Sequence, residues 1–419
     1  MENTHNSFLE NRYFIWTAVG AILAVYFFTV IVYTSEFPFV DDYVTTLEFL
    51  NRYYEANTGW GKIQAILAQW SEHRIGVGKS ITLLYQKAFG PVSFVVLSVL
   101  SNFSLVAFYA ILLLQVKKEA RLYLILPLAL LFFQLQYYIA QQWLVTSSSF
   151  FYMLLFSILS LHFFRKNQML YALLFGAIAI FCNANGFLIL LGEAVLLFLH
   201  KDLKRGSLFL AILGACMGVY FIGYVPHEND KLLTFYYLKN PWPTIHYTWM
   251  FVGAPLNLFS EAATVMGALA CGYFGWLTYK RYYERNPVVY LLLFTLLATA
   301  VLAALGRSFW SVQQALESRY KIFSTIIWLC VLISLVEEYV PRAIRVWYPL
   351  LLTGCICFCV GSYLTSWKFM VRFRERKEAQ FTDIYTDKPI KVMSDAREIL
   401  LLSIQKNYYK APKGALLRH

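Results

Sequence analysis

Two adjacent carboxylates, Asp41 and Asp42, follow the first long apolar stretch of the chain, residues 14–34. If that stretch crosses a bilayer, both acids lie at its mouth, where a charged carboxylate begins to lose its water. Two like charges so close together also raise the pKa of at least one, which suits a general base. We assign the base to Asp41 and an orienting role to Asp42, although the two roles could be reversed. The alternative is a pair of solvated acids that ends a helix.

A second group of polar residues follows in the same segment: Glu72, His73, Arg74 and Lys79. Arg74 and Lys79 suit a phosphate group, Arg through its planar fork of donors and Lys as a point charge. Glu72 and His73 are weaker candidates, for contacts with phosphate or sugar. The alternative for the cations is that they belong to a surface helix and reach out to water.

A third group comes late in the chain, where Arg307 precedes a short loop and Glu317-Ser318-Arg319-Tyr320 leads into the next apolar stretch. Arg319 is expected at the lip of the membrane, where an unpaired cation is costly, so a bound anion is a natural explanation. We therefore predict that Arg319 and Arg307 bind phosphate and that Tyr320 contacts substrate. The alternative is a surface pair between Arg319 and Glu317, which contributes little.

Other polar residues carry weaker signals. Glu193 lies inside an apolar stretch, and acids in that position are often functional, so it counts toward a transporter. His227, Glu228 and Asp230 could line a sugar site, but an ordinary exposed loop is the simpler interpretation. The sequence has no His-x-x-x-His and no Asp-x-Asp motif, so no cofactor and no metal site is expected.

The elements that must position these residues are apolar helices. The 419 residues are 59% hydrophobic and only 14% charged, with a mean hydropathy of +0.54, which leaves too few charges for a water-solvated surface. A span needs about 20 apolar residues. We predict an all-α polytopic bundle with about eleven spans, and the two shortest of them could be one tight hairpin or a re-entrant pair. The spans are expected at 14–34, 91–115, 122–139, 146–164, 169–182, 186–200, 207–226, 262–279, 287–305, 321–336 and 347–366.

Two segments outside the spans are long. In the first loop, residues 35–90, Trp60, Ile63, Leu67 and Trp70 recur at helical spacing and predict a helix that lies flat in the membrane interface. The tail, residues 367–419, is basic, and Ser394 is placed to cap a helix over 395–407. We therefore divide the chain into a transmembrane catalytic module, 1–366, and a partly helical tail, 367–419.

The basic residues predict the orientation. The net charge of +12 does not indicate nucleic-acid binding, because a set of Lys and Arg residues falls in the N-terminal segment and in alternate short loops. This positive-inside pattern places the N-terminus in the cytoplasm and the 35–90 loop outside. The side of the tail stays open, because it depends on whether the number of spans is odd or even. The set is Arg12, Lys117, Lys118, Arg121, Arg165, Lys166, Lys201, Lys204, Arg205, Lys280, Arg281, Arg285, Arg342 and Arg345.

The layout resembles the C-type membrane glycosyltransferases. The resemblance rests on the long first external loop, on Asp41-Asp42-Tyr43 just after the first span, on Glu72-His73-Arg74 and on Glu317-Ser318-Arg319-Tyr320. Members of that family often have Asp-Glu or a single Asp at the first position, where this chain has Asp-Asp.

The resemblance implies an enzyme that transfers a hexose from a polyprenyl-phosphate donor to a surface glycan or lipid. It also implies a bacterial inner membrane, an active site facing the periplasm, and a subgroup that modifies O-antigen in lipopolysaccharide. A synthase and a flippase that supply the donor are then expected as partners, together with membrane lipids. Two alternatives stay open. One is a flippase or transporter for lipid-linked sugars, and the other is a polymerase or ligase of surface polysaccharide.

Overall fold

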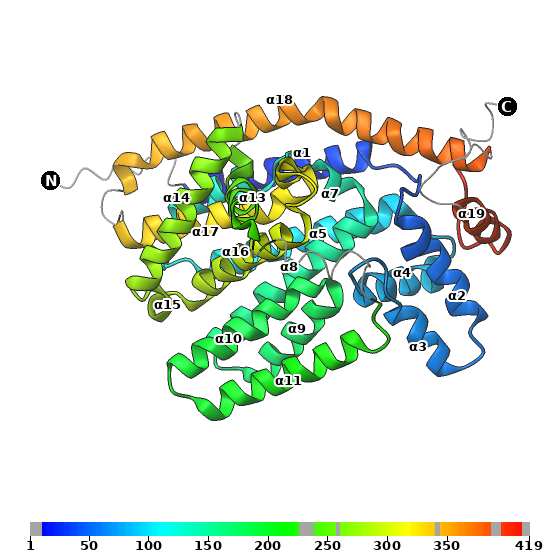
Figure 1. Cartoon of the computed structure of the whole chain (residues 1–419). Coiled ribbons are helices and arrows are strands. Elements are labelled where there is room, and N and C mark those ends of the chain that lie inside the picture. The colour runs from blue at the N-terminus through cyan, green and yellow to red at the C-terminus, as the bar shows by residue number, and fades with distance from the viewer. Residues whose placement is uncertain are drawn as a thin grey trace.

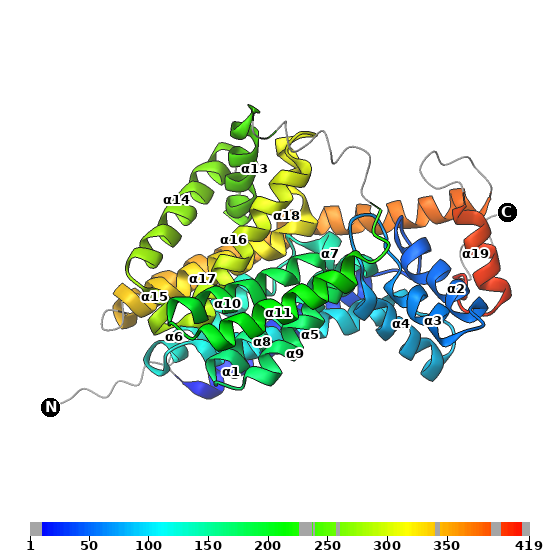
Figure 2. The ribbon, with the colours of Figure 1, turned by 60° about the horizontal axis from the view of Figure 1, so that its bottom comes forward.

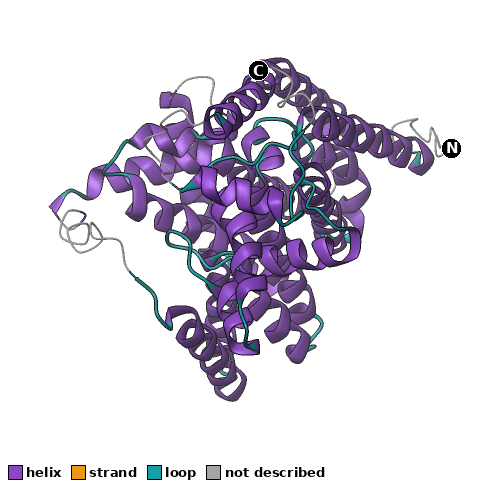
Figure 3. Cartoon of the chain, turned by 90° about the vertical axis from the view of Figure 1, so that its right-hand side faces the viewer, coloured by secondary structure: helices purple, strands orange, loops and turns teal. Residues whose placement is uncertain are grey.

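The computed structural model describes residues 11–225, 237, 239–256, 260–339, 344–386 and 395–412. Within these ranges every regular element is a helix and no strand is present, which confirms the predicted all-α class (Figure 3). Most of the helices lie side by side, and the long helix near the C-terminus runs along the whole assembly (Figure 1).

The first half of the chain alternates long helices with short connecting ones. The long first helix is followed by a π-helical turn and three short helices, and then by a series of apolar helices. In chain order they are α1 (Arg12–Tyr33), η2 (Tyr43–Glu48), α2 (Phe49–Glu55), α3 (Gly59–Leu67), α4 (Gly76–Phe89), α5 (Phe94–Gln115), α6 (Lys118–Phe132), α7 (Tyr138–Gln142), α8 (Leu144–Arg165), α9 (Met169–Cys182), η3 (Ala184–Gly186), α10 (Phe187–Leu199) and α11 (Leu203–Phe221).

The second half contains the longest helix of the protein. Two short 3₁₀ turns, η5 and η6, connect two apolar helices. Arg307 is the last residue of the first of these helices, and Arg319 lies in η6, just before the second. The elements are α13 (Pro241–Gly253), η4 (Ala254–Leu256), α14 (Ser260–Tyr279), α15 (Tyr282–Arg285), α16 (Pro287–Arg307), η5 (Val312–Leu316), η6 (Ser318–Tyr320), α17 (Lys321–Tyr339), α18 (Ile344–Tyr385) and α19 (Ala396–Gln405).

Seven helical segments among the described residues are long and apolar enough to cross a membrane. They correspond to α1, α5, α8, α11, α16, η6 with α17, and α18. The predicted spans at 122–139, 169–182 and 186–200 are shorter helices, because α6 already ends at Phe132 and because η3 separates α9 from α10. The predicted span at 262–279 is α14, which is long enough at 20 residues but is not among the seven. The predicted count of about eleven therefore includes four segments that are not among these seven candidate spans, and the count stays a prediction.

The connection between α9 and α10 is the close approach that the short hairpin requires. A Cβ added to Gly186 would lie 2.3 Å from the carbonyl carbon of Ala179, so only glycine fits there. Asn183 holds the turn from both sides, since its Oδ1 accepts from Asn185 N and its Nδ2 donates to Ser149 Oγ. These contacts join the turn to α8.

The outer surface of the long helices is apolar. On α18, Val346, Leu350 and Leu364 are each at least two-thirds exposed, and Phe28 on α1 is similar. In water such a surface would be an aggregation liability, whereas lipid tails cover it without cost. The helix lengths and this surface together indicate a membrane protein.

A second, smaller core joins the first loop to the C-terminal tail. Tyr43, Phe49 and Phe94 are buried together with Phe381 from α18 and Tyr409 from the tail. Helix α19 packs on η2, and both views place it beside α2, at the end of the molecule away from the N-terminus (Figures 1 and 2). The tail therefore lies at the same end of the molecule as the 35–90 loop.

The boundary drawn at 366/367 falls inside α18, which continues without a break to Tyr385. In the tail, the helix predicted over 395–407 spans Ala396–Gln405, and Ser394 lies outside the described residues. In the first loop, the predicted interfacial helix is α3, which begins after Thr58 and leaves Trp60 and Ile63 exposed. Its exposed tryptophan suits headgroup depth.

Candidate functional site

Asp41 lies in the tight turn between α1 and η2. The turn is strained at Val40, a β-branched residue with a φ of +41°, and strain of this kind is often stored at functional sites. The main-chain carbonyl of Asp41 accepts from Val44 N and Thr45 N, so the start of η2 fixes its backbone. Its carboxylate stays partly exposed.

Asp42 points the other way and is fully buried, with 0% exposure. Its Oδ2 accepts from Phe39 N at 3.0 Å and its Oδ1 from Val145 N at 3.0 Å, which fastens the turn to the start of α8. Burial raises the pKa of the Asp42 carboxyl, against the opposing charge of Lys377 and the two N–H donors. Asp42 therefore holds the turn in place, and of the two acids only Asp41 is accessible to solvent.

The surroundings of Asp41 contain residues from all three predicted groups. Burial raises the pKa of Asp41, and the Glu72 charge raises it further. A side-chain hydrogen bond with Trp70 and the positive charge of Arg319 act in the opposite direction. The charges of Glu72 and Arg319 therefore both act on the Asp41 carboxyl, and a site shared by the three residues stays a prediction.

Arg319 sits on η6, which Ser318 anchors to the segment before α7. Ser318 Oγ donates to Gln136 O at 2.8 Å and accepts from Ile139 N at 3.2 Å. Arg319 Nε lies 2.8 Å from Glu317 Oε2, so the pair expected in the alternative interpretation is present. The Nε–H makes no hydrogen bond, however, and the rest of the guanidinium has no acceptor within the described chain.

Tyr320 connects the two late arginines. The guanidinium carbon of Arg319 is 4.9 Å from the centre of the Tyr320 ring, and that of Arg307 is 5.6 Å away. Contacts of this kind are attractive and hold a planar cation in place. Arg307 is in the last turn of α16, where the helix dipole also favours it. Two guanidiniums therefore share one aromatic ring.

Glu72 and His73 form the edge of the site on the first loop. Trp70 and His73 exchange two main-chain hydrogen bonds, of 2.8 and 3.0 Å, which close a tight turn. Burial raises the pKa of Glu72, but the Ser71 hydroxyl bond and the positive charges of His73 and Arg307 outweigh it, so its pKa is lowered overall. Burial and the Arg307 charge lower the pKa of His73, whose Nδ1 has no partner in the described chain.

Arg74 and Lys79 are directed elsewhere. The Arg74 guanidinium donates to the main-chain carbonyls of Leu67 and Ile222 and ties the end of α3 to the end of α11. Lys79 Nζ donates to Ala68 O at 2.8 Å, and burial lowers its pKa to about 8. Both cations donate to main-chain carbonyls in the described structure, so we do not count them among the candidate phosphate-binding residues.

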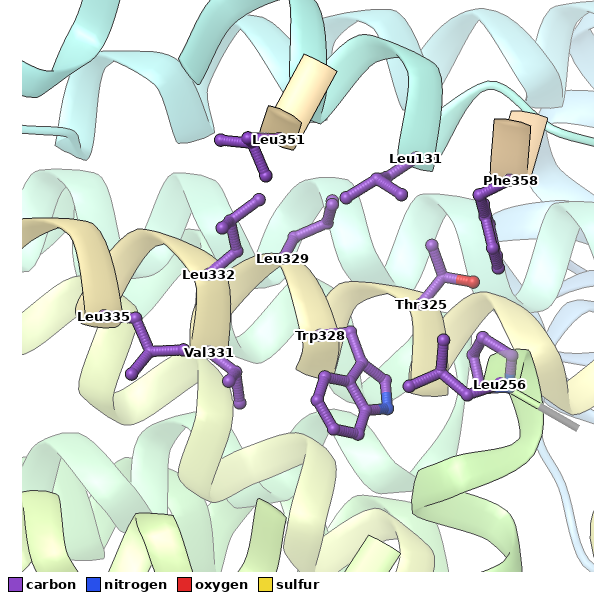
Figure 4. A pocket seen from close by; sticks show the side chains of 11 residues that line it. Leu131, Leu256, Thr325, Trp328, Leu329, Val331, Leu332, Leu335, Leu351 and Phe358 are labelled. Atoms are coloured by element: carbon purple, nitrogen blue, oxygen red, sulfur yellow. The ribbon is translucent and has the colours of Figure 1, made fainter. Parts of the chain in front are cut away.

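An apolar pocket of about 220 Å³ lies between α6, η4, α17 and α18 (Figure 4). Thr325, Leu256 and Phe358 lie toward one end and Leu335 at the other, with Trp328 and Leu329 between them. Thr325 is six residues after Arg319, about 9 Å along a helix. The pocket runs along one apolar face of α17, the helix that follows Arg319 in the chain.

The remaining candidates are accounted for as follows. Glu193 is fully buried, and Ser160 Oγ lies 2.9 Å from its Oε1. His227, Glu228 and Asp230 lie outside the described residues. Within the described ranges, no group of three His, Cys, Asp or Glu side chains is placed to hold a metal ion.

Comparisons with protein-family models, curated proteins and solved structures found no match for this chain.

Proposed function

We propose that this chain is a multi-pass membrane glycosyltransferase that transfers a hexose from a polyprenyl-phosphate donor to a surface glycan or lipid acceptor. One observation carries the proposal. Asp41, which is half-buried, lies within electrostatic reach of Arg319, a guanidinium that comes from late in the chain. A base next to a phosphate-binding cation is what such a transfer needs.

The proposed reaction is a single displacement. Asp41 removes the proton of an acceptor hydroxyl, whose oxygen forms a bond to the anomeric carbon of the sugar. The bond between that carbon and the phosphate oxygen breaks, and its electron pair leaves with the lipid phosphate. Arg319 and Arg307 stabilise the charge that develops on this leaving group. Attack from the opposite side inverts the configuration at the anomeric carbon.

The apolar pocket supports a lipid-linked donor. Its lining of Leu, Val, Phe and Trp side chains suits a hydrocarbon chain, and α17, which supplies much of that lining, directly follows Arg319 and Tyr320 in the chain. We place the protein in a bacterial inner membrane, with the site on the periplasmic face, where it would modify O-antigen or a similar glycan. A synthase and a flippase would supply its donor.

A flippase is the principal alternative, and Glu193 was the residue in its favour. The contact between Glu193 and Ser160 gives that acid a packing role between α8 and α10. A polymerase or ligase would use the same donor chemistry and differs only in its acceptor.

The test is the transfer of labelled sugar from polyprenyl phosphate to a glycan acceptor by purified protein. Asp41→Asn keeps the size of the side chain but removes the base, so the rate should fall by about 10²–10⁴-fold. Glu48→Gln, on the same loop, is the control and should keep the wild-type rate. Transfer that survives Asp41→Asn would remove the site proposed here. Lipid movement across liposomes without any transfer would favour the flippase.

A further inference from the structure

Two tyrosine hydroxyls beside the arginine pair are buried and have no partner within the described chain. Tyr247, on α13, is fully buried, and Tyr320, on η6, is 6% exposed. A buried hydroxyl without a hydrogen bond costs about 1–3 kcal/mol, so native proteins rarely leave one unused. Two of them close to the same two cations call for an explanation.

The neighbours of Tyr247 along α13 direct its side chain toward this site. Thr244, three residues earlier, lies with its hydroxyl 3.3 Å from that of Ser308, next to Arg307. Phe251, four residues later, packs its ring 5.8 Å from the ring of Tyr320. Residues three and four apart share one face of a helix, so Tyr247 lies between these two contacts. The charges of Arg307 and Arg319 both act on its hydroxyl.

The donors of this group outnumber its acceptors. Within the described chain Arg319 has one ion pair, with Glu317, the side chain of Arg307 makes no hydrogen bond, and both tyrosine hydroxyls are unbonded. Each hydroxyl can donate one proton and each guanidinium several. An anion with several oxygen acceptors would satisfy all four side chains at once.

We propose that Tyr247 and Tyr320 donate hydrogen bonds to a phosphate group that Arg307 and Arg319 bind, and that these four side chains form one phosphate site. The proposal rests on the proposed function and names the groups that hold its leaving group. A phosphate monoester carries more charge than the diester of the donor. Four donors therefore favour the departing lipid phosphate over the intact donor, which is the preference that lowers the barrier.

The experiment measures binding and not turnover, so its failure is separate from a failure of glycosyl transfer. Full-length protein in nanodiscs of zwitterionic lipid is titrated with polyprenyl monophosphate, inorganic phosphate and uncharged polyprenol. Tyr247→Phe and Tyr320→Phe remove only the hydroxyls and keep the rings that pack against Phe251 and the arginines. Tyr152→Phe, a change of the same size in the buried core of α8, is the control, and thermal unfolding checks that each variant is folded.

Each phenylalanine variant should bind polyprenyl monophosphate roughly tenfold to a hundredfold more weakly, because a hydrogen bond to a charged group is lost. The control should bind as wild type does. A parallel loss for inorganic phosphate would mean that the phosphate alone is recognised, and a loss seen only with the lipid would mean that the chain is also required. Three results would each overturn the proposal: both variants bind polyprenyl monophosphate as wild type does, the variants lose affinity for polyprenol equally, or the wild-type protein does not bind polyprenyl monophosphate.

Discussion

The two ends of α17 hold polar clusters that differ in how completely they are satisfied. At the far end, Glu337 is buried, and its Oε1 accepts from Lys117 N at 2.9 Å. Its Oε2 accepts from Tyr282 OH at 2.7 Å, and Asn286 Nδ2 lies within 3.3 Å of both oxygens. Both carboxylate oxygens of Glu337 have donors, so this carboxylate is satisfied without a ligand.

At the near end, about 27 Å away along the helix, Arg319 and its neighbours are incomplete. Two tyrosine hydroxyls and most of the N–H groups of two arginines have no acceptor in the described chain. A buried polar network that is fully satisfied stabilises a fold, whereas one left open is costly unless something binds to it. The Glu337 cluster thus has what a structural role requires, whereas the Arg319 cluster has unused donors that a ligand could accept from.

Of the three effects predicted below, the largest is expected at the Arg319 end of α17, which we call the open end because its donors lack acceptors; the Glu337 end is the closed end. Arg319→Ala should raise the barrier to sugar transfer by about 2–4 kcal/mol, because the charge on the leaving phosphate loses a direct partner. Arg319→Lys should recover only part of this, since the planar fork is lost. Steady-state transfer assays on both variants give the numbers.

The control for that change is Arg52→Ala, an exposed arginine on α2 that pairs with Glu48. It should leave the rate unchanged, since exposed pairs contribute little. A fully active Arg319→Ala protein would reduce Arg319 to its surface pair with Glu317.

The second effect tests the closed end. Glu337→Ala leaves the Tyr282 hydroxyl, Asn286 and the Lys117 N–H without their shared acceptor. Unfolding should become easier by about 1–3 kcal/mol, measured by thermal or denaturant unfolding in detergent. The transfer rate per folded molecule should stay close to wild type. A large loss of turnover with unchanged stability would show that the two ends are functionally coupled.

The sequence predicted the part of the fold that depends on local pattern. Apolar runs identified the long helices, and the spacing of Trp60, Ile63 and Leu67 identified α3, although Trp70 lies beyond its end. The lengths of α6, α9 and α10 could not be predicted, because their ends are set by contacts made in the folded chain, such as the close approach of Gly186 to the main chain of Ala179. Nor did the sequence indicate that α18 continues to Tyr385, since its last turns are charged and pack against the first loop and α19.

The site divides in the same way. Asp41, Arg307, Arg319 and Tyr320 were predicted because charged residues beside apolar stretches stand out. Arg74 and Lys79 stood out equally, yet their donors are taken by carbonyls such as that of Ile222, which only the folded chain brings near. Tyr247 gave no signal at all, because a tyrosine within an apolar helix looks like core packing.

The smallest effect is a shift in pH dependence, and it tests whether Asp41 belongs to the open end. A general base works only when it is deprotonated, so transfer should fall as the pH drops through the raised pKa of Asp41. Glu72 contributes to that raised pKa through its negative charge. Glu72→Gln removes the charge and lowers the pKa of Asp41, so the acid limb of the rate profile should move to lower pH. Glu337→Gln, at the closed end, should leave the limb in place. The profiles of kcat and KM separate this from a direct contact between Glu72 and substrate, which would raise KM at every pH without moving the limb. A limb that does not move in Glu72→Gln, or that moves equally in Glu337→Gln, would show that Asp41 is not the group whose titration controls transfer.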